Sequence, residues 1–211
     1  DIYVMNPSDP QSARMVLSTD SGGWAAIDFA PNGHELLVFN YISATDSQLH
    51  IVDVETAAIR QVTRDATPVA YGNLQFAPDG RLWVSSDKDA DVQRLGVLDT
   101  QTGVFTSMID GGRWDISSFD IAKDGKTIAY VVNEAGFSRL YLYDIASAQK
   151  RQVLGLPPGE IGSGMKFAPW GTLGFTVYSN QAPGDAYSLD PATLTVTRWT
   201  ESETGGLDPA L

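Results

Sequence analysis

Apolar and polar residues alternate along most of this chain with a period of two, the period of a β-strand with one buried face. The alternation is plain at 27–29 (IDF), 74–76 (LQF), 119–121 (FDI) and 165–167 (MKF), where we expect the apolar residues to be buried. No stretch of ten or more residues has the 3.6-residue period of an amphipathic helix. The pattern therefore predicts an all-β chain.

A short sequence motif, present in four copies, closes each of these alternating stretches. It reads FAPNG at 29–33, FAPDG at 76–80, IAKDG at 121–125 and FAPWG at 167–171, at intervals of 47, 45 and 46 residues. The glycine supplies the positive φ of a tight hairpin, and a second apolar run follows each time. Lys123 replaces the usual proline in one copy, and Trp170 replaces the usual Asp or Asn in another. The phrase predicts the first hairpin turn of each repeat.

A second marker keeps the same interval. An aspartate closes a short apolar run at Asp53, Asp99, Asp144 and Asp190, and a hydroxyl residue follows three positions later in each copy. An aspartate placed in this way accepts backbone N–H groups of the turn that follows it. We therefore expect the four aspartates to be structural turn caps rather than calcium ligands or acid–base catalysts.

Each repeat has room for four antiparallel strands, and such a sheet buries both faces only between neighbours, as the blades of a β-propeller do. We expect complete blades at 24–63, 70–109, 114–153 and 161–200, a half blade at 1–18 and an exit segment at 201–211. A half blade leaves a ring open. The chain 1–211 is therefore expected to be one partial domain of a larger, seven-bladed propeller, with open strand edges that favour self-association.

The amino-acid composition excludes several classes of binding partner and of functional site. Hydrophobic residues make up 43% of the chain, enough for a sizeable core, and 26 acidic against 14 basic residues give a net charge of −12 with no basic cluster. We expect neither nucleic acid nor membrane as a partner. The chain has no cysteine and no apolar run of about 20 residues, so disulfides, thiolate zinc sites and membrane spans are excluded. A soluble protein is expected, and its compartment stays open, because a chain without cysteine suits either redox environment.

No catalytic, metal or cofactor site is predicted. A serine nucleophile on a G-x-S-x-G turn is missing, because Ile161 stands where the first glycine before Ser163 should be. His34 follows a turn glycine and His50 lies in a predicted strand, so neither is expected to act as a base or a metal ligand. The five tryptophans are expected to pack in the core or between blades.

The loop GGRWD at 111–115 joins two predicted blades. Loops of this kind line the tunnel of a propeller, so Arg113 and Asp115 are weak candidates for binding a peptide terminus or a neighbouring domain. The alternative is a solvated charge pair beside a Gly-Gly turn.

The F-x-P-D-G turn, followed by a D-x-x-T-G turn, resembles the propellers of the Tol system and of prolyl oligopeptidase family serine peptidases. Three stretches are similar to the blades that precede the α/β-hydrolase domain in bacterial members of the second group. They are TDSGGWAAIDFAPNG at 19–33, YVVNEAGFSRLYLYD at 130–144 and the stretch 156–210, which ends in TRWTESETGGLDPA.

The second resemblance implies a non-catalytic propeller that gates access of peptides and docks against its own α/β-hydrolase domain, which is not in this sequence. The parent protein would then be a bacterial serine peptidase, of the cytoplasm or the periplasm. The first implies instead a stand-alone Tol-type scaffold that binds a protein or a polysaccharide. A third alternative, a sugar lyase or glycosidase, would need clustered acids or histidines, and the two histidines lie apart.

Overall fold

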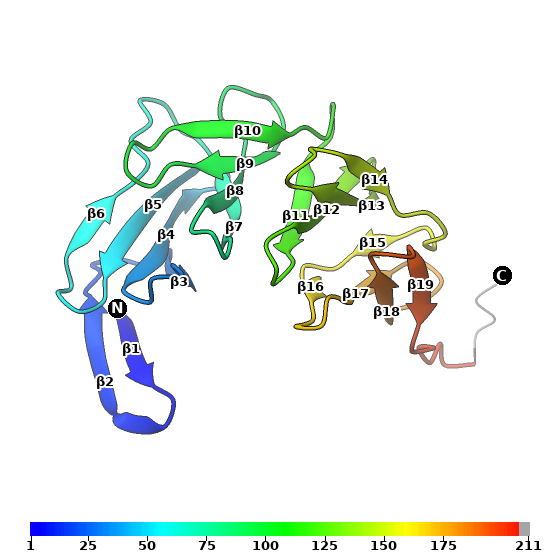
Figure 1. The fold of residues 1–211 in the computed structure, drawn as a ribbon, viewed down its shortest axis with the longest axis horizontal. Helices are drawn as coiled ribbons and strands as arrows, with labels where there is room; N and C mark the ends of the chain where they lie inside the picture. The colour runs from blue at the N-terminus through cyan, green and yellow to red at the C-terminus, as the bar shows by residue number, and fades with distance from the viewer. Residues whose placement is uncertain (207–211) are drawn as a thin grey trace. The chain divides into compact units, whose positions relative to one another are not determined.

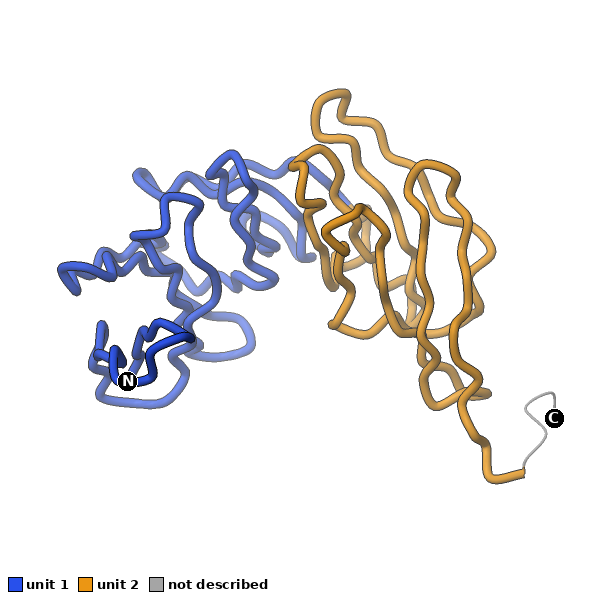
Figure 2. Tube along the Cα trace, turned by 60° about the horizontal axis from the view of Figure 1, so that its bottom comes forward, with its two compact units in different colours: residues 1–110 blue, residues 111–211 orange. Residues whose placement is uncertain are grey.

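The computed structural model describes residues 1–206, which form nineteen β-strands and no helix (Figure 1). The predicted all-β fold is confirmed. None of the described residues therefore builds a helix that could span a membrane. The chain divides into two compact units, residues 1–110 and 111–211 (Figure 2). The last five residues of the predicted exit segment 201–211 lie outside the described residues.

Unit 1 contains one two-stranded sheet and two four-stranded sheets, all antiparallel. The small sheet pairs β1 (Ile2–Asn6) with β2 (Asp9–Leu17). The first large sheet has the order β3 (Trp24–Phe29), β4 (Glu35–Ser43), β5 (Asp46–Asp53) and β6 (Ile59–Gln61). The second has the order β7 (Tyr71–Phe76), β8 (Leu82–Ser86), β9 (Arg94–Leu98) and β10 (Phe105–Ile109). In both, neighbours in the sheet are neighbours in the chain.

Unit 2 repeats this meander twice. One sheet has the order β11 (Ile116–Ile121), β12 (Thr127–Glu134), β13 (Phe137–Asp144) and β14 (Lys150–Gln152). The other contains β15 (Glu160–Ile161), β16 (Lys166–Phe167), β17 (Leu173–Tyr178), β18 (Asp185–Asp190) and β19 (Thr195–Arg198). Because β15 and β16 both pair with β17, they are two halves of one interrupted first strand.

The first hairpin of each large sheet turns at the predicted glycine. Gly33, Gly80, Gly125 and Gly171 have φ angles of 75°, 87°, 71° and 97°. The N–H of each donates to the carbonyl three residues earlier, at 2.8 to 2.9 Å. A residue with a Cβ is strained at such φ angles, so the turn itself requires glycine at these positions.

Apolar faces of consecutive sheets pack together in each unit. In unit 1, Leu37 and Ile51 of the first large sheet share a buried cluster with Leu82 and Val84 of the second. In unit 2, residues of β12 and β13 share a cluster with residues of β16 and β17. Each of these sheets thus buries an apolar face against the sheet next to it, as the blades of a propeller do.

The first strand of the first large sheet, β3, departs from the predicted burial. Ile27 and Phe29 were expected inside, yet 39% and 47% of their surface is exposed. The β1–β2 sheet has two strands and packs over β4 and β5, against Leu36 and Val38, and against Trp24 at the start of β3. The other end of β3 lies outside this cluster, so its apolar residues stay exposed. Asp28, between the two apolar residues, turns to the next sheet and accepts the Phe76 N–H at 2.9 Å.

A second contact between consecutive sheets recurs in both units. The Arg60 guanidinium on β6 donates to the carbonyl of Thr100, and the Arg151 guanidinium on β14 donates to the carbonyl of Pro191 at 3.0 Å. In each case the acceptor directly follows a marker aspartate of the next sheet. An arginine therefore holds the last turn of one sheet onto the outer strand of the sheet before it.

Candidate functional site

The four marker aspartates lie at the turn between the third and fourth strand of their sheets. The Asp53 carboxylate accepts the N–H and the hydroxyl of Thr56, both at 2.8 Å, and Asp144 accepts the same two groups of Ser147, both at 2.7 Å. Asp99 and Asp190 accept backbone N–H groups two and three residues ahead, at 2.8 to 3.3 Å. This geometry supports the predicted role as turn caps.

These hydrogen bonds also set the charge state of the four carboxyls. The backbone N–H of Thr56, followed by its hydroxyl, holds the pKa of Asp53 below its ordinary value, and the backbone N–H of Thr102 acts on Asp99 in the same way. The hydroxyl of Ser147 lowers the pKa of Asp144, and the backbone N–H of Ala192 lowers that of Asp190. A carboxyl held in its ionised form is a poor general acid.

Arg113 and Asp115 are exposed in the loop before β11. The Arg113 guanidinium lies over the Trp114 ring, 5.2 Å from its centroid, and the Asp115 carbonyl accepts the Asn133 N–H at 3.0 Å. The loop is thus tied locally to β12. Whether it binds a peptide terminus or a neighbouring domain stays a prediction.

The two histidines lie apart in the first large sheet. His34 is exposed, and its Nδ1 lies 3.0 Å from an oxygen of Glu55 in the adjacent turn. His50 is buried in β5 with its ring centroid 4.9 Å from that of Trp24, and burial lowers its pKa. In residues 1–206 no group of three or more His, Asp or Glu side chains could hold a metal ion.

The prediction of packed tryptophans is correct for Trp83, which is fully buried, and wrong for Trp170 and Trp199. The exposed fractions of these two are 80% and 69%. Trp199 lies after β19, and its indole N–H donates to the Ser188 hydroxyl at 2.8 Å. Trp170 lies in the turn between β16 and β17, where a ring cannot reach the sheet core.

Trp170 lines a groove of about 460 Å³ in unit 2. The first wall is the turn of Trp170 itself, with Pro169 beside it, and the second is the β18–β19 turn with Pro191. Lys123 and Asp124, from the β11–β12 turn, form the third. The bond from Arg151 to the Pro191 carbonyl fixes the second wall. The groove was not predicted, because it forms where turns of two sheets meet.

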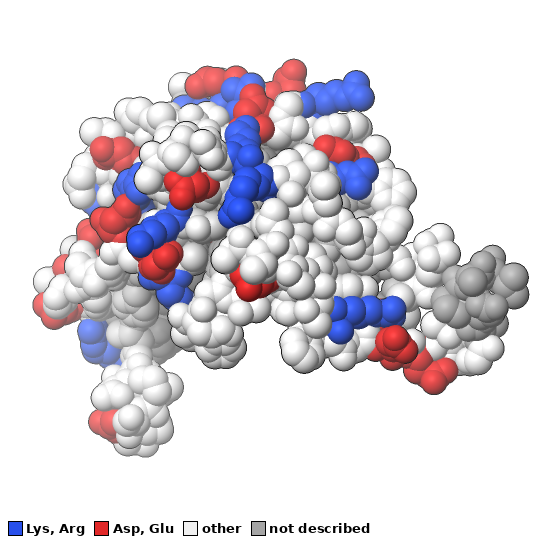
Figure 3. All heavy atoms as spheres, turned by 45° about the vertical axis from the view of Figure 1, so that its right-hand side comes forward, with Lys and Arg blue, Asp and Glu red and all other residues white. Residues whose placement is uncertain are grey.

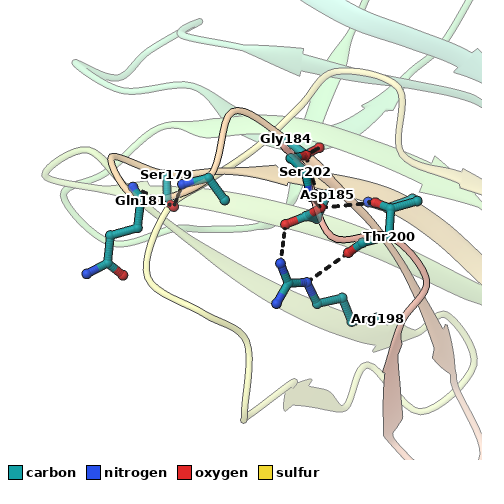
Figure 4. Close-up of polar contacts among 9 residues, drawn as sticks. Ser179, Gln181, Gly184, Asp185, Arg198, Thr200 and Ser202 are labelled. Atoms are coloured by element: carbon teal, nitrogen blue, oxygen red, sulfur yellow. Dashed lines mark hydrogen bonds and ion pairs between the residues drawn. The ribbon is translucent and has the colours of Figure 1, made fainter. Parts of the chain in front are cut away.

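A buried carboxylate anchors the segment that follows β19 (Figure 4). Asp185, at the start of β18, is 1% exposed. One of its oxygens accepts the Arg198 guanidinium at 2.6 Å, and the other accepts the Ser202 N–H at 2.8 Å and the Thr200 hydroxyl at 3.1 Å. Burial acts to raise its pKa, but the hydrogen bonds from Arg198, Ser202 and Thr200 outweigh burial and lower it.

On the face drawn in Figure 3, basic side chains lie beside acidic ones. Among the described residues, Arg81 pairs with Asp79 at 2.6 Å and Arg139 pairs with Glu134 at 3.1 Å, all with exposed side chains. Such exposed pairs contribute little to stability, at most about 1 kcal/mol each.

No family model matches the sequence, and no curated protein matches it. Solved structures do match. A puromycin hydrolase superposes with a TM-score of 0.79 at 19% identity, over 96% of this chain and 32% of that one. Prolyl oligopeptidase B from Galerina marginata gives 0.76 at 14% identity, over 95% and 30%. TolB from Acinetobacter baumannii gives 0.69 at 15% identity, over 92% and 47%.

The chain thus spans about a third of the two hydrolases and about half of TolB. At these identities the likeness concerns the fold. The predicted resemblance to the propeller of prolyl oligopeptidase family proteins is confirmed at that level, and the chain has a β-propeller fold.

Proposed function

We propose that this chain is the non-catalytic propeller portion of a serine peptidase of the prolyl oligopeptidase type. The observation that carries the proposal is the match to puromycin hydrolase, which covers 96% of this chain and 32% of that one. A serine peptidase needs a nucleophile, a histidine and an acid in contact, and this sequence has no G-x-S-x-G turn. The chemistry would then belong to an α/β-hydrolase domain in the same protein.

The Asp185 network supports this proposal. It fastens residues 198–202, which belong to the stretch 156–210 that resembles the exit from the last blade toward a hydrolase domain. A connection held by a buried carboxylate leaves the propeller at a fixed point. The domain that follows would dock against the propeller in a defined orientation, with the sheets as a rigid base.

The propeller would act by steric selection. A rigid β scaffold beside an active site excludes folded proteins and admits peptides that are short or unfolded. Peptides are therefore the substrates that we propose for the parent enzyme. Specificity for residues at the scissile bond would lie in the hydrolase domain, which touches the reacting atoms.

Hydrolysis assays test the proposal. The complete protein that the gene encodes should cleave prolyl or alanyl chromogenic peptides and lose this activity to a serine-directed inhibitor, and the chain 1–211 alone should cleave neither. Turnover by 1–211 that resists such inhibitors would overturn the proposal. A gene product that ends near residue 211 without a hydrolase domain would overturn it as well.

The second candidate function is a Tol-type scaffold that binds a protein or a polysaccharide. It is favoured by the likeness to TolB structures, including one from Agrobacterium tumefaciens at a TM-score of 0.70 over 90% of this chain and 66% of that one. Fold alone does not separate the two functions. The complete gene product separates them, because a peptidase needs a nucleophile, a histidine and an acid, and a scaffold needs none of these.

A further inference from the structure

Trp170 departs from the hydrogen-bonding pattern of the other three first-hairpin turns. The equivalent residues are Asn32, Asp79 and Asp124, and a side-chain oxygen of each accepts the N–H two residues further on, at 3.0 Å. An indole has no such oxygen, so this turn lacks the hydrogen bond and exposes 80% of a large ring. Turn chemistry does not explain the tryptophan. Residues that break a local rule in this way are found at functional sites.

The exposed ring forms one wall of a hollow that has the size of a ligand site. The groove of about 460 Å³ lies within the range of roughly 300 to 1,000 Å³ that is usual for such sites. Beside the indole, the pyrrolidine rings of Pro169 and Pro191 supply flat apolar surface, and Lys123 and Asp124 supply charge.

We propose that this groove binds a proline-rich segment in the polyproline II conformation that contains no acidic residues. Polyproline II segments dock in grooves lined by aromatic rings, since the flat prolyl ring packs on the aromatic face and the preformed helix loses little entropy. Their carbonyls have no internal partner and need donors. The Trp170 indole N–H and the Lys123 ammonium are such donors.

The open hydrogen-bond donors of the groove match the carbonyls of this ligand. In the described residues the Lys123 side chain makes no ion pair or hydrogen bond, whereas the acceptors are partly used. One Asp124 oxygen already accepts the Lys126 N–H, and one Asp190 oxygen accepts the N–H groups of Ala192 and Thr193. A proline-rich segment presents acceptors and few donors, so it matches open donors. A sugar hydroxyl needs partners of both kinds, and the second oxygens of Asp124 and Asp190 are acceptors for it, so binding of an oligosaccharide is the competing outcome of the test.

Charge selects among peptides. The chain carries −12, and the Asp124 and Asp190 carboxylates line the groove, so acidic peptides are repelled, and a lysine or arginine beside the prolines is attracted. The proposal does not depend on the peptidase assignment, because a binding scaffold could carry the same groove.

Calorimetric titration of the full chain with a decaproline peptide flanked by lysines tests the proposal. The key variant is Trp170→Asp, which removes the ring and restores the residue type of the other turns. We expect its affinity to fall on the order of tenfold or more, while urea unfolding shows that it is as stable as the parent chain. Trp199→Phe changes the other exposed tryptophan, outside the groove, and should leave binding unchanged.

Three results would overturn the proposal: no binding by the parent chain at millimolar peptide, equal binding by the Trp170→Asp variant, or Trp170-dependent binding of a neutral oligosaccharide in place of the peptide. A Lys123→Gln variant adds an independent measurement. It should weaken peptide binding several-fold, because the ammonium donates to ligand carbonyls, and it leaves the turn glycine in place. An unchanged affinity in both Lys123→Gln and Trp170→Asp would exclude the groove.

Discussion

The Asp120 carboxylate accepts the backbone N–H of Phe167 at 2.6 Å, across the 47 positions that separate two consecutive sheets of unit 2. Its other oxygen accepts the Lys166 ammonium, also at 2.6 Å. Asp28 makes the equivalent bond to the Phe76 N–H in unit 1, at 2.9 Å. The stacked sheets are thus joined by charge-assisted hydrogen bonds at their first strands, in addition to their apolar faces.

Asp120→Ala should lower the free energy of unfolding by about 2 to 3 kcal/mol, because a buried carboxylate with two charge-assisted bonds is lost and the Phe167 N–H is left without its acceptor. Asp120→Asn keeps one acceptor oxygen and should cost less. Urea unfolding followed by circular dichroism measures both. Asp28→Ala, at a half-buried site with one such bond, is the matched comparison and should be the milder change. An Asp120→Ala variant as stable as the parent chain would contradict this account.

Ala148→Gly should stabilise the chain. Ala148 is exposed in the turn after Asp144 with a φ of 57°, and the equivalent residue of the second large sheet is Gly103, with a φ of 73°. Relief of a strained alanine gains roughly 1 to 2 kcal/mol, and the greater freedom of glycine in the unfolded chain costs roughly 0.5 to 1 kcal/mol. The midpoint of urea unfolding should therefore rise.

Ala146→Gly is the control for that change. It lies in the same turn, but its φ is not positive, so glycine brings no relief there and only the entropic cost remains. The midpoint should fall. If both glycine variants lower the midpoint, backbone strain at Ala148 does not contribute significantly to the stability of the chain.

The two turn motifs were predictable from the sequence because each acts within six residues. Positive φ at Gly80 and the bonds from Asp53 to its own turn need no knowledge of distant parts of the chain. The Asp120 bond to Phe167 was missed because the polar member of an alternating strand was expected to face solvent. A signal was present, since an acid stands before the turn phrase in both the first and the third repeat.

The groove and the exposed tryptophan could not be predicted from the sequence of any single repeat. Trp170 was recognised as a departure from the turn pattern, yet its ring was expected to pack, because burial of an aromatic residue is the usual outcome. Where the ring lies depends on turns at 122–127 and 190–192, which come from different repeats. Spacing within the sequence does not determine how such turns meet.

Acid should destabilise the chain through its cap aspartates. Their pKa values are lowered in the folded state, so the stability they provide is complete above the unfolded value of about 3.9 and is lost as the pH falls through the folded values. Asp144→Asn removes one ionisable cap and keeps an acceptor oxygen. Urea midpoints between pH 3 and 7 should show the difference between variant and parent shrinking below about pH 4. A difference that is constant over this range would show that charge at Asp144 is irrelevant.

The β1 edge should promote self-association. Among the described residues β1 pairs with β2 alone, and Tyr3, Met5 and Met15 of this small sheet are 60%, 52% and 48% exposed. An unpaired edge beside apolar side chains pairs readily with another chain. Sedimentation across a wide concentration range should show oligomers for the parent chain and fewer for Met5→Lys. A monomer at all concentrations would contradict this expectation, and Lys126→Arg controls for a surface change elsewhere.

Asp185→Asn should free the segment after β19. The amide weakens the bond to Arg198 and replaces an ionised acceptor of the Ser202 N–H, so residues 198–202 should exchange their amide hydrogens faster, while β17 keeps its protection. Asp190→Asn, at the other end of the same strand β18, controls for loss of a carboxylate and should leave exchange in 198–202 unchanged. Hydrogen exchange read by mass spectrometry separates the two segments. Equal exchange of residues 198–202 in the two variants would mean that β18 as a whole has loosened. Asp185 would then not be a specific anchor for the segment through which we propose that the chain leaves the propeller.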